Sequence, residues 1–263
     1  MPAYDVDVST LVVAIDGPSG SGKSTLARGL ARALRLRYLD TGAMYRALTW
    51  WVLRGEVDLA DEAAVVARLA DFDLDVSGDL ERQAVAVGGH DVTAAIRSAE
   101  VTRAVSAVSA IPEVRRQLVA RQRAIIGGGG IAVEGRDIGT VVCPDAPVKI
   151  FLTAAVDARA VRRSLEVAPN ANDASVDLVR ADLDRRDRLD SGRRASPLNQ
   201  APDAVAIDST GMDADQVLAA ALDLVRESTG VRPAGATMAG SPVGGSPSTP
   251  GPDAAAPAQI GGT

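Results

Sequence analysis

Short apolar runs alternate with longer segments of helical periodicity along most of the chain. The apolar runs are typical of buried strands and span residues 11–15, 37–39, 131–133, 148–152 and 204–207. Apolar positions between them recur with helical spacing, which predicts helices over residues 23–34, 42–53, 60–69, 113–126, 156–166, 176–189 and 214–226. Strands separated by helices predict an α/β fold with a five-stranded parallel sheet that is covered on both faces.

Residues 72–96 break this rhythm, because apolar and polar residues alternate there with a period of two. The segments DFDLDV and RQAVAV are separated by SGDLE, which predicts a small antiparallel sheet inserted into the parallel fold. His90, the single histidine of the chain, follows within the sequence GGHD. We expect it in a surface turn, without a catalytic role.

The composition changes from about Ser228 to the end of the chain, where Gly, Pro, Ala, Ser and Thr predominate. Such a segment cannot bury enough apolar area to offset its loss of conformational entropy. Residues 228–263 are therefore predicted to be a disordered tail. The rest of the chain is long enough for one large domain with insertions.

The formal net charge of −6 disfavours binding to bulk nucleic acid or to an anionic membrane. A few local arginines can still hold a small phosphorylated ligand. Cys143 is the single cysteine, so no intrachain disulfide can form. The N-terminus lacks a signal-peptide pattern, and no apolar stretch approaches the ~18 residues of a membrane span. We expect a cytoplasmic monomer that binds neither nucleic acid nor membrane and needs no protein partner.

The segment GPSGSGKS (17–24) matches the phosphate-binding pattern GxxxxGK[ST] and lies between a predicted strand and a predicted helix. Its glycines let backbone amides turn toward phosphate oxygens, and the helix N-terminus adds its positive end. Lys23, one of only two lysines, suits the β- and γ-phosphates, and Ser24 suits Mg²⁺. The residues predicted to hold a nucleoside triphosphate are Gly17, Pro18, Ser19, Gly20, Ser21, Gly22, Lys23, Ser24 and Thr25.

This loop occurs in several classes of protein, which other motifs distinguish. A GTPase would carry NKxD, which is absent, and the DxxG string at 208–211 stands late and alone. An ATPase motor would place an acid after a long apolar strand; Glu134 and Asp208 are so placed, but the rest of that signature is missing. A small-molecule kinase fits better, and a nucleotide-dependent binding switch is the non-enzymatic alternative.

Three further segments supply what a kinase needs: several cations, an acceptor pocket and a lid that excludes water. In LDTGAMYR (39–46), Thr41 begins a predicted helix that carries Tyr45 and Arg46, and Arg46 suits an acceptor phosphate. An ordinary helix cap is the simpler interpretation of the same residues.

The segment EGRDIGT (134–140) follows a predicted strand, at the edge where open parallel sheets bind ligands. The guanidinium of Arg136 suits a phosphate, and the carboxylate of Asp137 suits an exocyclic amino group such as cytosine N4. The alternative is a structural ion pair in a tight turn.

Residues 159–194 are dense in arginine, as a lid over phosphates would be. Helical spacing places Arg186 and Asp190 on one face, with Arg193 one position short of the next turn. A solvated helix with surface salt bridges would look similar.

Together these segments resemble the bacterial cytidylate kinase family, whose members phosphorylate CMP and dCMP. The resemblance runs from about Leu11 to Arg226 and rests on IDGPSGSGKST, LDTGAMYR, IRSAEVTRAVSAVSAIPEVRRQLVARQR, EGRDIGTVVCPDAPVKIFL, RRDRLDSGRRASPL and AIDST. Two departures are small: Thr41 stands where serine is common, and Glu134 where aspartate is common. Both keep the functional group.

The resemblance implies substrate contacts. Ser106, Arg115 and Asp137 would contact the cytosine ring. The phosphate and sugar of CMP would be seated by residues of the helix after the second strand, namely Thr41, Tyr45 and Arg46.

The resemblance also implies how the reaction is catalysed. ATP would be the donor, with Mg²⁺, and Lys23, Arg136 and Arg186 would neutralise the charge on the transferred group. Asp190 would bind ribose hydroxyls, and Arg193 would lie near the phosphates. The resemblance further implies a core of 1–40, 127–155 and 195–227, a nucleoside-monophosphate domain of 41–126, a lid of 156–194 and the tail of 228–263.

Related kinases remain alternatives. Shikimate kinase shares the loop but is shorter and lacks such an insertion, and the DG[FY]PR-type segment of adenylate kinase is absent here. UMP differs from CMP at the 4-position and N3 of the ring. Asp137 should favour cytosine, because a carboxylate accepts from an amino group but repels a carbonyl oxygen. We therefore expect the reaction of ATP with CMP or dCMP to give ADP and CDP or dCDP.

Overall fold

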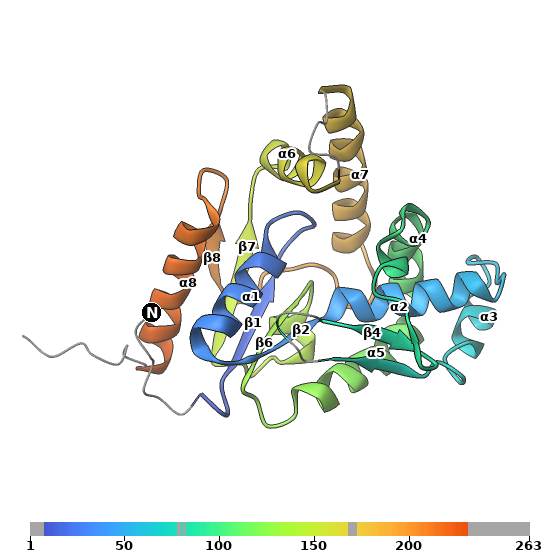
Figure 1. Ribbon diagram of the computed structural model, residues 1–263, viewed down its shortest axis with the longest axis horizontal. Coiled ribbons are helices and arrows are strands. Elements are labelled where there is room, and N and C mark those ends of the chain that lie inside the picture. The colour runs from blue at the N-terminus through green and yellow to red at the C-terminus, as the bar shows by residue number, and fades with distance from the viewer. Residues whose placement is uncertain (1–7, 78–79, 81–82, 168–172, 231–263) are drawn as a thin grey trace, which may run out of the picture.

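The computed structural model describes residues 8–77, 80, 83–167 and 173–230. Its centre is a parallel sheet of strand order β2-β6-β1-β7-β8 (Figure 1). The five strands are β1 (Val12–Asp16), β2 (Arg37–Asp40), β6 (Ile131–Gly135), β7 (Val148–Thr153) and β8 (Val205–Asp208). The predicted α/β fold and its five strands are confirmed, with strand ends that move by at most two residues.

Helices cover both faces of this sheet, as its apolar strands require. On one face, α1 (Lys23–Leu34) and α8 (Ala214–Thr229) pack against β1 and β7. On the other face, α2 (Thr41–Arg54) and α5 (Pro112–Ile126) pack against β2 and β6. The helices bury side chains at the spacing seen in the sequence, among them Leu26, Leu30 and Leu34 of α1.

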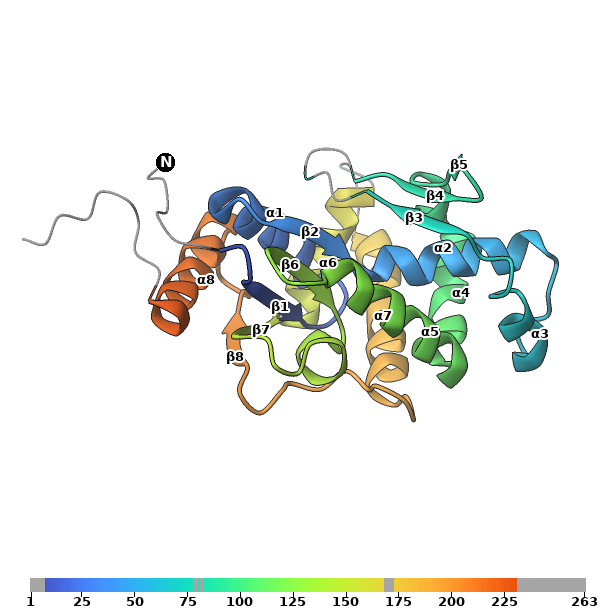
Figure 2. The same ribbon diagram turned by 90° about the horizontal axis from the view of Figure 1, so that it is seen from below.

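A second group of elements lies beside the main sheet (Figures 1 and 2). It contains the antiparallel strands β3 (Leu74–Val76), β4 (Val85–Val87) and β5 (His90–Asp91). The helices of this group are α2, α3 (Glu62–Ala67), the 3-10 turn at Ala95–Arg97, α4 (Ala99–Ala110) and α5. The predicted inserted sheet is confirmed. The turn predicted for His90 is wrong, because this exposed residue begins β5 and pairs with Val87.

Besides β5 and the 3-10 turn at Ala95–Arg97, two further elements were not anticipated. Helix α4 begins after Ser98, whose hydroxyl accepts a hydrogen bond from the Val101 amide at 3.3 Å. It is rich in alanine, serine and valine, which give a weak periodic signal. The second element is a turn of π-helix at Ile138–Val142, in which the Val142 amide donates to the Asp137 carbonyl at 3.1 Å. Asp16, at the end of β1, stabilises this turn, so the local sequence alone does not predict it.

The helices α6 (Val156–Val167) and α7 (Asp173–Ser191) pack side by side above the carboxyl edge of the main sheet (Figure 1). Toward the C-terminus, α8 continues to Thr229. The first two residues of the tail predicted over 228–263 are therefore helical. Residues 231–263 of that tail lie outside the described residues. Within the described part of the chain, no helix is both long and apolar enough to cross a membrane.

Candidate active site

A cleft opens at the carboxyl edge of β1 and β6, between the phosphate loop and helices α2, α4 and α7. Most of the site residues predicted from the sequence line it: Ser19, Gly20, Gly22, Lys23, Ser24, Thr25, Thr41, Tyr45, Arg46, Ser106, Arg115, Arg136, Asp137, Arg186, Asp190 and Arg193. Gly17, Pro18 and Ser21 of the phosphate loop do not line this cleft. Ser21 faces a neighbouring pocket instead. Side chains from distant parts of the sequence therefore meet at one edge of the sheet.

The phosphate loop depends on backbone conformations that favour glycine. Gly17, Gly20 and Gly22 have φ angles of +151°, +77° and +93°. A Cβ atom on Gly17 would lie 2.0 Å from the carbonyl oxygen of Leu152, so no other residue fits there. The Nζ atom of Lys23 donates to the Pro18 carbonyl at 2.6 Å. Burial lowers the pKa of Lys23 to about 7, with Arg136 adding to the effect.

Asp16 ends β1 directly before this loop, and the sequence did not single it out. Its two carboxylate oxygens accept from the amides of Ile138 at 2.8 Å and Gly139 at 2.7 Å. These bonds fix the turn that follows Arg136 and Asp137. Burial raises the pKa of Asp16 to about 6, although the two amides act in the opposite direction.

Glu134 brings a carboxyl group to the floor of the cleft beside the phosphate loop. The hydroxyls of Tyr38 and Ser24 hydrogen-bond to it. Its backbone carbonyl accepts from Thr41 Oγ1 at 2.8 Å, which connects the end of β6 to the start of α2. Burial, followed by the charge of Asp40, raises the pKa of Glu134.

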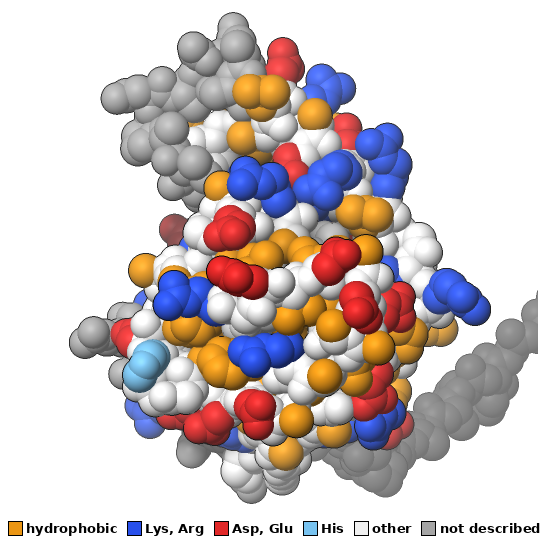
Figure 3. Space-filling view, turned by 90° about the vertical axis from the view of Figure 1, so that its right-hand side faces the viewer, with side chains coloured by type: hydrophobic (Ala, Val, Ile, Leu, Met, Phe, Trp, Pro, Cys, Tyr) orange, Lys and Arg blue, Asp and Glu red, His pale blue; other side chains and the backbone are white. Residues whose placement is uncertain are grey.

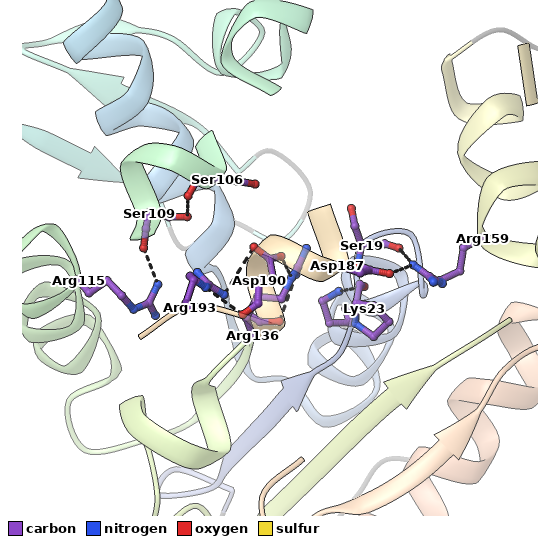
Figure 4. A network of polar contacts seen from close by, with 12 residues as sticks. Ser19, Lys23, Ser106, Ser109, Arg115, Arg136, Arg159, Asp187, Asp190 and Arg193 are labelled. Atoms are coloured by element: carbon purple, nitrogen blue, oxygen red, sulfur yellow. Dashed lines mark hydrogen bonds and ion pairs between the residues drawn. The ribbon is translucent and has the colours of Figure 1, made fainter. Parts of the chain in front are cut away.

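One end of the cleft is a buried group around Arg115. Its Nη2 atom lies 2.5 Å from Asp137 Oδ2, and its Nη1 atom donates to the Ser109 carbonyl at 3.1 Å. The guanidinium also stands 5.1 Å from the centre of the Tyr45 ring. Ser106 lies one turn before Ser109 on α4 (Figure 4). The structure therefore brings together the three residues expected at the cytosine ring.

The middle of the cleft holds a second group, around Asp190. Arg136 Nε lies 2.9 Å from Asp190 Oδ2, and Arg193 Nε donates to the Asp190 carbonyl at 3.1 Å (Figure 4). Burial raises the pKa of Asp190, but Arg136 and Arg193 outweigh it, and the net shift is downward. Arg136 and Asp137 thus turn to different partners, Asp190 and Arg115, and do not pair with each other.

Positive charge predominates in the cleft. Among the described residues that line it, eight are cationic and four are acidic. Burial and the neighbouring Arg186 and Arg97 lower the pKa of Arg46 to about 9. Burial and Arg136 lower that of Arg186, whose buried Nε has no hydrogen-bond partner among the described residues. Crowded, incompletely paired guanidinium groups favour the binding of an anion.

Several lining residues were missed from the sequence: Asp40, Arg97, Ser109 and Arg163. Arg97 pairs with Asp40 at 2.7 Å, and both line the cleft. Arg97 and Ser109 lie within the quoted IRSAEV and VSAIPEVR strings, but only the packing of the 3-10 turn at Ala95–Arg97 and of α4 shows that they face the cleft. On the face that Figure 3 shows, basic and acidic side chains are mixed.

A second pocket lies on the other side of the phosphate loop, next to the turn between β8 and α8. Its apolar walls are Leu26, Leu152, Met212 and Val217. Arg162 closes one side and donates to Ser209 Oγ at 3.0 Å. Apolar walls with a few polar groups suit a flat heterocycle.

Comparison with known proteins identifies the family of this chain. A family model described as "Cytidylate kinase" matches residues 13–227. The cytidylate kinase of Mycolicibacterium paratuberculosis is 52% identical over 226 residues, which cover 85% of this chain and 98% of that protein. That of Geobacillus kaustophilus is 46% identical over 218 residues, which cover 83% and 97%. Among solved structures, shikimate kinase from Acinetobacter baumannii in complex with shikimate is 16% identical, over 84% of this chain and 93% of that chain, with a TM-score of 0.38.

Proposed function

This chain belongs to the cytidylate kinase family, and we propose how its cleft carries out the reaction of that family. The reaction transfers a phosphoryl group from ATP to CMP or dCMP and gives ADP and CDP or dCDP. The single observation that supports our assignment of roles is the cleft itself. It joins a complete phosphate loop to the buried Arg115–Asp137 pair through a row of arginines.

We assign the donor to the phosphate loop. The backbone amides of the loop from Gly17 to Thr25, other than at Pro18, surround its phosphates, and the ammonium of Lys23 leaves the Pro18 carbonyl to bind the β- and γ-phosphates. The pocket with walls of Leu26, Leu152, Met212 and Val217 takes the adenine. The triphosphate then points from that pocket into the cationic cleft.

Mg²⁺ fits the oxygen donors next to Lys23. Ser24 offers a hydroxyl, and Glu134 offers a carboxyl group that a water molecule can connect to the ion. The described residues contain no group of three or more His, Cys, Asp and Glu side chains that could hold a metal ion. We assign the ion to the Ser24 hydroxyl and to the ATP phosphates, where it would neutralise phosphate charge.

The acceptor base belongs between α4 and the end of β6. Asp137 accepts from the cytosine 4-amino group, and Arg115 and Ser106 hydrogen-bond to other polar atoms of the ring. Arg115 cannot turn away easily, because the Tyr45 ring and the Ser109 carbonyl hold it. A uracil would set its 4-carbonyl against a carboxylate, so this arrangement favours CMP over UMP.

The remaining residues orient the acceptor phosphate. Arg186, whose buried Nε has no hydrogen-bond partner among the described residues, binds that phosphate together with Arg46, and Thr41 and Tyr45 lie beside it. Other cleft side chains complete the transfer site: Asp190 holds the ribose hydroxyls, while Arg136 and Arg193 stay close to the transferred group. In-line placement and charge neutralisation then account for catalysis, without a covalent enzyme intermediate.

We further propose that the protein acts as a cytoplasmic monomer. The phosphate-loop core, the nucleoside-monophosphate domain of residues 41–126 and the lid of residues 156–194 are proposed as its working parts.

A coupled assay of ADP release tests the assignment. We expect ATP consumption that depends on CMP or dCMP and is at least about tenfold slower with UMP, AMP or shikimate at equal concentration. Equal rates with CMP and UMP would remove Asp137 from base recognition. An absence of CMP-dependent turnover would contradict the proposal as a whole.

A further inference from the structure

The tip of the phosphate loop is held by two side chains from α6 and α7. Asp187 Oδ1 on α7 accepts from the Ser19 amide at 3.4 Å. Arg159 Nη1 on α6 donates to the Ser19 carbonyl at 3.0 Å and lies 2.6 Å from Asp187 Oδ2. Figure 4 shows the three residues together, next to Lys23. Both backbone polar groups of Ser19 are therefore bound by one ion pair.

This ion pair is anchored in the body of the protein. The Arg159 side chain is 7% exposed and that of Asp187 is 21% exposed. Arg159 Nε also donates to the carbonyl of Ala154, just beyond β7, at 3.0 Å. The pair is thus shielded from solvent more than an ordinary surface ion pair. Its geometry is fixed by hydrogen bonds to the Ser19 amide, the Ser19 carbonyl and the Ala154 carbonyl.

Gly20 lies at this contact, within ordinary van der Waals range of both helices. Its φ angle is +77°, and a Cβ atom there would lie 3.4 Å from Arg159 Cβ and 3.8 Å from Leu183 Cδ2. The loop tip therefore touches both α6 and α7. Asp187 and Arg159 reach the cleft through Ser19 of the phosphate loop, so their influence should fall on the donor.

We propose that Asp187 is a positioning residue for the donor nucleotide. It acts through Arg159 and the Ser19 amide to hold the loop tip in the conformation that presents amides to the phosphates. The inference rests on the proposed donor site and adds to it a link between that site and the helices α6 and α7. The charge of Arg159 offsets that of Asp187, which keeps a carboxylate acceptable near the triphosphate.

The test compares two ion pairs that join the same helices. Asp187 and Arg159 touch the phosphate loop, whereas Arg180 and Asp157 pair at 3.1 Å on the exposed side of α6 and α7. Asp187→Asn keeps the size of the side chain and removes its charge, and Asp157→Asn is the matched control. We expect Asp187→Asn to raise KM for ATP, and Kd for ATP by calorimetry, about tenfold, with KM for CMP within about twofold. Asp157→Asn should change none of these.

Other results would overturn the proposal. If Asp187→Asn matched the control, or weakened CMP as much as ATP, the pair would be merely structural. If Asp187→Asn lowered KM for ATP, Asp187 would be an occupant of the phosphate site that the donor must displace. Melting temperatures of both variants show whether a loss comes from unfolding.

A second variant tests the route through Arg159. Arg159→Lys keeps the charge but loses the planar group whose Nε binds the Ala154 carbonyl while Nη1 binds Asp187 and the Ser19 carbonyl. We expect the double variant, Asp187→Asn with Arg159→Lys, to raise KM for ATP no more than about twofold beyond Asp187→Asn alone. If the effects of the two single variants on KM for ATP added up in the double variant, the shared route would be contradicted. Lys23→Ala separates this inference from the donor assignment. If Lys23→Ala weakens ATP and Asp187→Asn does not, only the role of Asp187 falls; if Lys23→Ala leaves ATP binding intact, the donor site itself is wrong.

Discussion

The donor and acceptor halves of the active site are built in different ways. The donor phosphates are assigned to nine consecutive residues, 17–25, whose backbone makes the binding surface. The acceptor is assigned to side chains from four separated segments, of which Tyr45, Ser106, Asp137 and Arg186 are examples. The donor half forms from the local conformation of one loop, whereas the acceptor half forms only when the whole chain has folded. A motif therefore identifies a nucleotide-binding protein, but the assembled side chains decide which molecule is phosphorylated.

The two halves also differ in how their parts are held. The loop relies on glycines with positive φ and on one close approach to the Leu152 carbonyl. The acceptor half relies on buried ion pairs, such as Arg115 with Asp137, whose side chains are 3% and 4% exposed. Removal of one partner from a buried pair leaves an uncompensated charge and costs about 3–5 kcal/mol. Substitutions in the acceptor half should therefore affect stability as well as binding.

The largest effect is expected at the donor half, from Lys23→Ala. We expect kcat to fall about 10²–10³-fold, because a charge aimed at the transferred phosphoryl group is lost. The melting temperature should change little, since Lys23 forms its one direct hydrogen bond among the described residues with Pro18. Steady-state kinetics and a thermal melt check both statements.

Lys23→Arg is the control for charge. It keeps a cation but not a compact one, so partial activity is expected. Near-normal turnover of Lys23→Ala would mean that the loop binds a phosphate without taking part in transfer, and the contrast between the two halves would fail.

The next largest effect is expected at the acceptor half, from Asp137→Ala. We expect kcat/KM for CMP to fall about 100-fold and KM for ATP to change by less than about threefold, because a site that loses a hydrogen-bond partner discriminates poorly. The preference for CMP over UMP should fall as well. Initial rates with varied CMP, UMP and ATP measure these changes.

Glu113→Gln is the matched control for Asp137→Ala. It removes the charge of a carboxylate that lies two residues before Arg115 in the sequence. This carboxylate pairs with the exposed Arg116 on the outer side of α5 rather than with Arg115. An equal loss for CMP and ATP in Asp137→Ala would place Asp137 outside the base pocket.

A smaller effect at the donor half is expected from Gly20→Ala. Both Gly20, at φ +77°, and Gly89, at φ +76°, pay the same backbone cost of about 1–2 kcal/mol when alanine is introduced. Gly89 faces open space, whereas Gly20 faces Arg159 and Leu183. We expect Gly20→Ala to raise KM for ATP several-fold and Gly89→Ala to leave it unchanged. If both variants behave alike, contact between the loop and α6 and α7 has no part in donor binding.

The smallest effect is expected from removal of residues 231–263. The match to the cytidylate kinase family ends at residue 227, and both halves of the site lie before it. Activity of the shortened chain should stay within about twofold of the full chain, measured under the same saturating conditions. A large loss of activity would mean that residues 231–263 contribute to catalysis in addition to the donor and acceptor halves.

Much of the architecture followed from local patterns. The five strands, α1 and the inserted sheet were predicted because apolar periodicity records which face of an element is buried. Helix α4 and the π-helical turn at Ile138–Val142 were not predicted. The first has small residues with a weak pattern, and the second depends on Asp16, which is more than 120 residues away.

The sequence by itself determined the phosphate loop, because backbone conformation there depends on glycine at fixed spacing and on a lysine that follows at once. It also indicated which acids and arginines could serve the acceptor. Only the tertiary structure decided their partners: Arg136 with Asp190, Asp137 with Arg115, and Asp187 with Arg159 and Ser19. The physical reason is that hydrogen bonds and ion pairs act over a few ångströms. Partners far apart along the chain become neighbours only when the sheet and its helices have packed.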